Sequence, residues 1–109
     1  MKRKHSLRRS KPKPHVPDSD IESQLYRAFS LLESEQDYAN FLRDLLSTAE
    51  ITEFANRLEI ARLLIERDKS YLEIAELVGT STTTVTRVAQ WLFRGCGGYN
   101  KVLRLLDDE

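Results

Sequence analysis

The segment from Tyr71 to Leu92, "YLEIAELVGTSTTTVTRVAQWL", places one glycine between two stretches with the apolar spacing of a helix. Two helices that cross steeply need a small residue where they approach and a turn residue free of Cβ strain, and apolar residues must lock the second helix onto the first. Ala75 and Gly79 meet the first two needs, and four residues at inward spacing meet the third: Ile74, Val78, Val85 and Val88. The segment therefore predicts a helix-turn-helix over about residues 70–94, and not an ordinary helical hairpin.

Six hydroxyl side chains follow Gly79, although serine and threonine are poor residues for a helix interior. Local helix propensity therefore does not explain them. On an outer helix face, a hydroxyl can bond a phosphate or either kind of base edge, and a threonine methyl can touch a thymine methyl. Six residues fall on the face opposite Val85 and Val88, and they form the predicted DNA-binding site: Ser81, Thr82, Thr83, Thr86, Arg87 and Gln90.

The residue types in this set indicate which DNA groups individual members can contact. Arg87 can pair with guanine or phosphate, and Gln90 can reach adenine or the backbone. Taken singly, each residue also fits a solvated helix surface or a cap, and for Ser81 capping fits as well as DNA contact. No acidic residue lies between Gly79 and Leu106, so the set as a whole favours DNA.

The rest of the chain from Asp18 onward is helical in its pattern, with no alternating strand segment and no hairpin signal. Ser47-Thr48-Ala49-Glu50 and Ser70-Tyr71-Leu72-Glu73 both have capping-box spacing. Together with the apolar periods, these signals predict one all-α domain over residues 18–109. Its six helices are expected at about 18–33, 37–46, 47–67, 70–78, 81–94 and 99–106.

Apolar stripes predict which helix faces are buried. The first helix places one set on one face: Ile21, Leu25, Phe29 and Leu32. The third helix carries a longer stripe: Ile51, Phe54, Leu58, Ala61, Leu64 and Ile65. Ile60 and Leu63 lie off this stripe, which indicates that the third helix is buried against more than one neighbour.

The formal net charge of +0 conceals an asymmetry along the chain. Residues 1–17 contain no carboxylate and seven basic side chains, so residues 18–109 hold the other 10 of 17 basic residues against 17 acidic ones, a balance of −7. With three prolines and few apolar residues, segment 1–17 cannot offset its ordering entropy and is predicted to be a disordered basic arm. Such arms often touch nucleic acid, although a solvated tail without a partner fits the composition equally well.

Several functional classes find no support in the sequence. No apolar run approaches ~18 residues, so a membrane span or membrane partner is not expected. The single cysteine, Cys96, cannot form an internal disulfide, which fits a cytoplasmic protein and a buried or half-exposed structural thiol. His5 and His15 lie in the arm, far in sequence from Cys96, so no catalytic residues, no metal site and no cofactor are predicted.

The chain also resembles the Trp repressor-like proteins, and most closely their short bacterial branch of the YerC/YecD type. The resemblance runs from about Leu25 to Leu106 and is strongest in "EITEFANRLEIARLL", "SYLEIAELVGTSTTTVTRV" and "FRGCGGYNKVL". It implies an all-helical, intertwined homodimer with two helix-turn-helix heads, which contact DNA half-sites about one turn, ~34 Å, apart. The first three helices favour a dimer, because they carry more apolar surface than a monomer of this size easily hides.

The resemblance also raises the question of a ligand. In the tryptophan-sensing member of the family, two arginines flank the bound amino acid, and the matching residues are Arg57 and Arg87. The glycine that makes room for the indole corresponds to Val88, and a small hydroxyl residue near the ligand's amino group corresponds to Trp91. Because these side chains occupy the slot, free tryptophan is predicted not to be the effector. One hypothesis is that they fill the pocket and hold the head ready for DNA; the preferred alternative is that Trp91 is an ordinary core or dimer-contact aromatic.

These observations together predict a dimeric transcription regulator that binds double-stranded DNA at a palindromic operator. Repression is expected, because a compact protein of this size acts most simply by covering a promoter, while activation stays open. The alternative is a helical protein-interaction module that does not read DNA. The −7 balance of residues 18–109 supports that alternative, since attraction to phosphate normally supplies much of the affinity for DNA.

Overall fold

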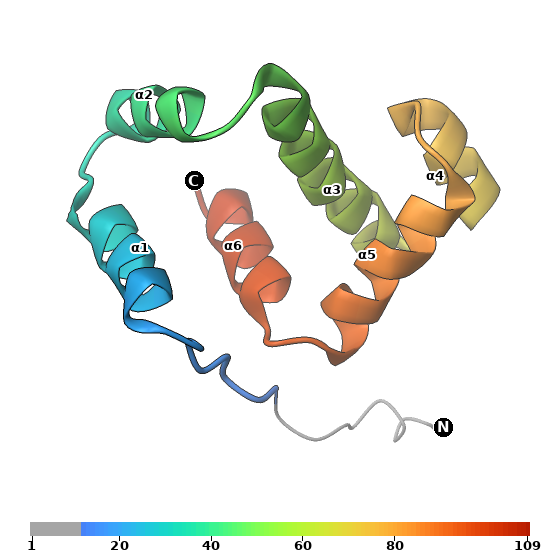
Figure 1. The fold of residues 1–109 in the computed structure, drawn as a ribbon. Helices are drawn as coiled ribbons and strands as arrows, with labels where there is room; N and C mark the ends of the chain where they lie inside the picture. Colours follow the sequence, from blue (N-terminus) through green and yellow to red (C-terminus); the bar gives the residue numbers. More distant parts are fainter. Residues whose placement is uncertain (1–11) are drawn as a thin grey trace.

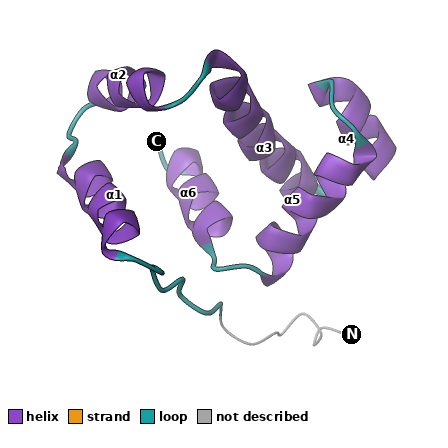
Figure 2. Cartoon of the chain, viewed as in Figure 1, coloured by secondary structure: helices purple, strands orange, loops and turns teal. Residues whose placement is uncertain are grey.

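The structure is a computed structural model that describes residues 12–109. The described part contains no strand and consists of helices α1 (Asp20–Leu31), α2 (Glu35–Leu45), α3 (Thr48–Glu66), α4 (Tyr71–Val78), α5 (Thr82–Arg94) and α6 (Gly98–Asp107) (Figures 1 and 2). The all-α prediction of six helices is confirmed, with ends that differ by a few residues. Most of the predicted basic arm, residues 1–11, lies outside the described residues, and residues 12–17 precede α1 without forming a helix.

Serine residues cap the starts of α1, α2, α3, α4 and α5. Both predicted capping boxes are present: Ser47 and Glu50 exchange two hydrogen bonds of 2.9 and 3.1 Å, and Ser70 and Glu73 exchange two of 2.7 and 3.1 Å. In each box, the serine oxygen accepts from a backbone N–H that the helix leaves without a partner, and the carboxylate accepts from the serine N–H. The short segments before α3 and α4 are therefore fixed by local chemistry.

Gly79 ends α4 and starts the turn of the helix-turn-helix. Its φ of 82° lies in the left-handed region, which a glycine adopts without Cβ strain. The N–H groups of Gly79 and Thr80 both donate to the carbonyl oxygen of Ala75 at 2.9 Å. This closes the last turn of α4 and directs the chain into α5, which Ser81 caps.

The core lies where α3, α4 and α5 meet, and α6 adds Leu103 to it. Ile60 of α3, Ile74 of α4 and Val85 of α5 are each 0% exposed, so every helix of this trio contributes a completely buried side chain. Val88 and Ala75 are also buried, as their spacing predicts. The packing therefore locks α5 onto α3 and α4 and fixes which side of α5 faces outward (Figure 1).

Helices α1 and α2 pack on each other but bury no residue within the described chain. The Phe29 ring of α1 lies 6.4 Å from the Tyr38 ring and 5.5 Å from the Phe41 ring of α2, measured between centroids. Ile21, on the predicted apolar face of α1, is 81% exposed, so no other part of the single chain covers it.

The predicted apolar stripe of α3 is only partly buried in the single chain. Phe54 and Ile65 are 48% and 43% exposed, whereas Ile60 and Leu63, off the stripe, are 0% and 6% exposed. Helices α4 and α5 pack against a face of α3 that is rotated toward Ile60 and Leu63, and this packing, not the apolar stripe alone, decides burial. The prediction that α3 is buried against more than one neighbour is confirmed, since α4, α5 and α6 all contact it.

Candidate nucleic-acid interface

The face of α5 that was predicted to bind DNA is exposed along its whole length. Its six residues are all solvent-accessible, whereas Val85 and Val88 on the opposite side are 0% and 3% exposed. The exposed set is Ser81, Thr82, Thr83, Thr86, Arg87 and Gln90. The outward face required for contact with a duplex is therefore accessible in the folded chain.

Two of the hydroxyl groups are engaged in bonds to the helix itself. Ser81 is the N-cap of α5, and its Oγ accepts from the Thr84 N–H at 3.2 Å and lies 3.2 Å from Thr84 Oγ1. Thr86 Oγ1 donates to the carbonyl oxygen of Thr82 at 3.0 Å. Because a hydroxyl has one proton, Thr86 is left with acceptor lone pairs and its methyl group for other contacts.

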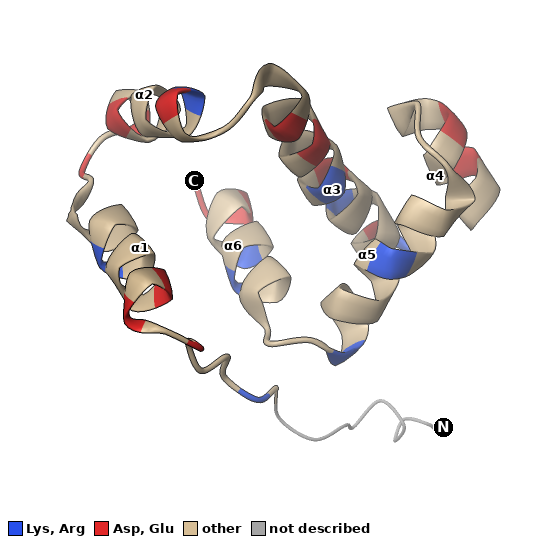
Figure 3. Cartoon of the chain, in the orientation of Figure 1, with Lys and Arg blue, Asp and Glu red and all other residues tan. Residues whose placement is uncertain are grey.

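The charged side chains of α5 are basic, whereas residues 18–109 as a whole have a net charge balance of −7. Helix α5 carries Arg87 and Arg94 and no carboxylate, while most of the acidic side chains lie on α1, α2, α3 and α4, with a few in the loops and at the end of α6 (Figure 3). A third arginine, Arg67, lies near the second half of α5, with its guanidinium carbon 5.6 Å from the centroid of the Phe93 ring. Locally, the surface is therefore suited to an anionic partner.

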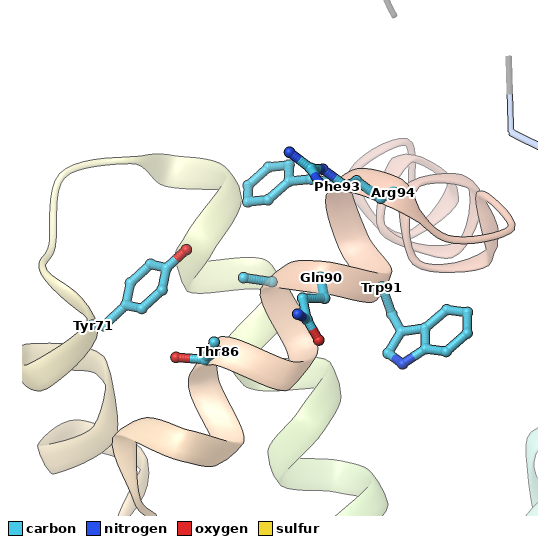
Figure 4. A pocket seen from close by; sticks show the side chains of 7 residues that line it. Tyr71, Thr86, Gln90, Trp91, Phe93 and Arg94 are labelled. Carbon is cyan, nitrogen blue, oxygen red and sulfur yellow. The ribbon is translucent and has the colours of Figure 1, made fainter. Parts of the chain in front are cut away.

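A hollow of about 480 Å³ opens between the start of α4 and the second half of α5. Figure 4 shows Tyr71 of α4 facing Thr86 and Phe93 of α5 across it, with Trp91 projecting away on the other side. The full lining is Tyr71, Thr86, Ala89, Gln90, Trp91, Phe93 and Arg94. The exposed face of α5 is thus continuous with a recess that begins on the first helix of the motif.

The sequence interpretation missed four residues of this recess: Tyr71, Ala89, Phe93 and Arg94. For Arg94 a signal existed, because it follows Gln90 by four residues and so lies one turn further along the same face. Tyr71 belongs to another helix. No spacing within α5 could have indicated its position, which depends on how α4 crosses α5.

The four residues singled out for a ligand pocket line one cavity of about 260 Å³. Arg57, Arg87, Val88 and Trp91 surround it together with Glu53, Thr84 and Tyr99. Burial raises the pKa of the Tyr99 hydroxyl, and the nearby charge of Arg57 opposes that rise. The structure therefore brings the two arginines together at a polar, partly enclosed space.

The side chains within this cavity differ from the expected arrangement. Trp91 is 62% exposed, so its interpretation as a core aromatic is wrong within this chain, and a contact across a dimer stays a prediction. Val88 is 3% exposed and packs in the core. Space remains beside both residues, so they do not fill the pocket completely. Arg57 already has a neighbour of opposite charge, because its Nη2 lies 4.0 Å from Glu53 Oε1.

Other chemistry is sparse in the part of the chain that the structure describes. Cys96 is exposed, which corrects the expectation of a buried or half-exposed structural thiol; it lies in the glycine-rich turn between α5 and α6, away from the core. Residues 12–109 contain no group of three or more histidine, cysteine, aspartate or glutamate side chains that could hold a metal ion. No helix among these residues is long and apolar enough to cross a membrane.

Comparisons with a family model, a curated protein and solved structures give consistent matches. The family model described as Trp repressor protein matches residues 22–107. The Bacillus subtilis protein YerC is 35% identical over 80 residues, which cover 73% of this chain and 76% of YerC. A TrpR-like protein from Eubacterium eligens superposes with a TM-score of 0.76 at 33% identity, covering 83% of this chain and 92% of that one. A candidate Trp repressor from Staphylococcus aureus gives a TM-score of 0.73 at 28% identity, covering 84% and 90%.

Proposed function

This chain belongs to the Trp repressor protein family, and we propose from that membership that it is a sequence-specific DNA-binding regulator of transcription. The main support is the amphipathic character of α5, which buries its valines on one face and exposes a hydroxyl-rich face without carboxylates on the other. A helix of 13 residues is ~20 Å long, and the major groove, ~12 Å wide, admits an α-helix. We also propose that the protein is cytoplasmic, because the DNA of bacteria, the source of its relatives, lies in the cytoplasm.

Within this proposal the residues of the face divide into two tasks. Thr82, Thr83, Arg87 and Gln90 contact base edges, and Thr86 contributes its methyl group. Tyr71 and Arg94, which both line the hollow, contact the phosphate backbone and hold the helix in register. Ser81 acts mainly as the cap that starts α5.

We propose further that the chain works as a homodimer and represses by covering a palindromic operator. The support is the apolar surface that the single chain leaves uncovered. Ile21 and Leu31 of α1, Leu45 of α2 and Phe54 of α3 are 81%, 77%, 47% and 48% exposed. Pairing two copies hides such surface and places two heads on DNA half-sites ~34 Å apart.

Free tryptophan is, in our proposal, not the effector of this protein. Val88 is packed at the inner wall of the arginine cavity, where its branched side chain narrows the space for an indole. Glu53 lies near Arg57 and repels the carboxylate of an amino acid. Although a cavity remains, its lining is therefore poorly matched to free tryptophan.

Selection of bound fragments from a random DNA pool tests this function directly. We expect a palindromic consensus, together with a dimer mass in sedimentation and loss of selectivity in Thr82→Ala. A rival function, a protein-interaction module, is favoured by the −7 balance of residues 18–109. Failure to bind random duplex even at low salt supports that rival and overturns DNA recognition.

A further inference from the structure

Arg67 ends α3 in a backbone conformation that arginine rarely adopts. Its φ of 62° and ψ of 19° lie in the left-handed region. Among residues 12–109, the other two residues with positive φ are both glycines, Gly79 and Gly97. A glycine would avoid the clash between Cβ and backbone that makes this region costly for arginine. Because such strain gathers at functional sites, Arg67 calls for a role beyond ending the helix.

The guanidinium of Arg67 is not engaged by the carboxylates next to it in the sequence. Glu66 Oε2 lies 3.0 Å from Arg62 Nη1, and Glu66 Oε1 lies 3.8 Å from Lys69 Nζ. Asp68 Oδ1 lies 3.0 Å from the same lysine nitrogen. In the described part of the chain, no carboxylate forms an ion pair with Arg67. Its positive charge is therefore available to an anion from outside the chain.

The Arg67 side chain extends to α5. Its guanidinium carbon lies 5.6 Å from the centroid of the Phe93 ring, which is the distance of a cation–π contact. Phe93 lines the recess between α4 and α5 together with Tyr71 and Arg94, and Figure 4 shows Phe93 and Arg94 next to each other at the end of α5. The seven residues that line this recess include no carboxylate. Three elements thus bring two guanidinium groups and a phenol hydroxyl to one recess and its edge.

We propose that Arg67 is a further phosphate-binding residue of the DNA interface, and that the Phe93 ring holds its guanidinium in place for this contact. This inference rests on the proposed function. A guanidinium presents a planar set of donors that matches phosphate oxygens, and it stays charged while it stacks on an aromatic ring. Arg67 binds the DNA backbone beside the contacts of Tyr71 and Arg94, so it strengthens binding to every sequence alike.

The salt dependence of binding tests this contact in the full-length protein. Fluorescence anisotropy measures the affinity of Arg67→Gln for the selected duplex and for a scrambled one at several salt concentrations. At ~0.1 M salt we expect a loss of roughly three- to ten-fold for both duplexes, and a slope of log affinity against log salt that is lower by about 1. A loss confined to the selected duplex overturns the phosphate contact, because Arg67 then reads bases.

Arg27→Gln is the matched control for the loss of one positive charge. Arg27 is exposed and lies on α1, which is on the opposite side of the molecule from α4 (Figure 1). Like Arg67, it forms no ion pair among the described residues. We expect its salt slope to equal that of the unaltered protein. If Arg67→Gln behaves as Arg27→Gln does, the proposal is overturned.

Arg67→Gly separates a role in binding from a role in folding. Glycine adopts the left-handed conformation without strain, so we expect the denaturant midpoint of unfolding to stay the same or rise. The affinity for both duplexes should nevertheless fall as in Arg67→Gln. A lower midpoint overturns the strain argument, because the arginine then stabilises the fold.

A double-mutant cycle with Phe93→Leu tests how Arg67 is held. Leucine keeps an apolar side chain at this position but removes the ring face. We expect Phe93→Leu to weaken binding roughly two-fold when Arg67 is present and to change nothing in the Arg67→Gln background. Equal weakening in both backgrounds overturns the role of the ring.

The same titrations distinguish failure of this inference from failure of the proposed function. If the unaltered protein binds the duplexes and Arg67→Gln binds them equally well, the contact of Arg67 is refuted alone. If the unaltered protein binds no duplex even at low salt, the proposed function is refuted and the contact of Arg67 with it.

Discussion

Thr86 donates its hydroxyl to the carbonyl oxygen of Thr82, one turn earlier in α5, at 3.0 Å. The proton that a free hydroxyl could give to a base acceptor is therefore used inside the helix. Thr86 keeps acceptor lone pairs and a methyl group for other contacts, and on the proposed DNA-binding face this methyl is suited to the methyl of thymine. We therefore propose that Thr86 contacts DNA mainly through its methyl group.

Substitutions at Thr86 separate these two contributions. Thr86→Val keeps a methyl in nearly the same place and removes the hydroxyl, so we expect affinity for the selected duplex to stay within about two-fold. Thr86→Ser keeps the hydroxyl and removes the methyl, and we expect a loss of about 0.8 kcal/mol. Anisotropy titrations of both variants check this. A larger loss of affinity in Thr86→Val than in Thr86→Ser contradicts the methyl contact.

Arg87 and Arg94 are expected to respond differently to removal. Arg87→Ala weakens binding to the selected duplex by ~1–3 kcal/mol and relaxes the base preference at one position of each half-site. Arg94→Ala weakens binding to all duplexes alike and reduces the slope of affinity against salt by about 1, since it neutralises a phosphate. Titrations of selected and scrambled duplexes at several salt concentrations measure both effects. If the two variants lose affinity for both duplexes equally and change the salt slope equally, the assignment of Arg87 to bases and Arg94 to phosphate is contradicted.

The helix starts and the turn of the motif were predictable because their signals are local. Ser47 with Glu50 and Ser70 with Glu73 act over three residues, and Gly79 acts through its own backbone angle. The exposed face of α5 followed from helical spacing alone. Such features do not depend on how the rest of the chain packs.

Features that depend on distant elements were not predictable from spacing. Trp91 has the helical spacing of a core residue but is exposed, because neither α3 nor α6 covers its ring in the single chain. Tyr71 joins the candidate site only through the crossing of α4 over α5. Ile21 likewise has the spacing of an apolar helix face but is 81% exposed in the single chain.

Gly79 is expected to be sensitive to a methyl group even though there is room for one. Its φ is 82° and a Cβ would meet no atom within 4 Å, so only backbone strain opposes Gly79→Ala. We expect a loss of ~1–2 kcal/mol in the free energy of unfolding, measured with denaturant. Gly98→Ala is the matched control, because its surroundings are equally open and its φ is not positive. It should leave stability unchanged or raise it, and an equal loss in both variants contradicts the strain.

The pKa of Glu22 is lowered to about 2 from an ordinary 4.5 by hydrogen bonds from Tyr26, Asp18 and His15, so the contacts of Glu22 at the start of α1 have a defined pH dependence. A carboxyl whose folded pKa is depressed stabilises the folded arrangement above its ordinary pKa, and that contribution is lost as pH falls from about 4.5 to about 2. Carbon-detected NMR of the Glu22 carboxyl should follow this titration. Tyr26→Phe removes the largest cause and should raise the pKa, while the Asp18 N–H still holds it below the ordinary value. An unchanged pKa in Tyr26→Phe contradicts the bond.

The arginine cavity provides the test of ligand sensing. Calorimetry with free tryptophan is expected to give no saturable heat at micromolar concentrations, because Val88 narrows the space and Glu53 repels a carboxylate next to Arg57. Glu53→Gln removes that repulsion without changing the size of the side chain. If charge is the main obstacle, this variant gains weak affinity; if the space is limiting, it does not. Saturable micromolar binding to the unaltered protein that disappears in Arg57→Ala contradicts the prediction and identifies the cavity as an effector site.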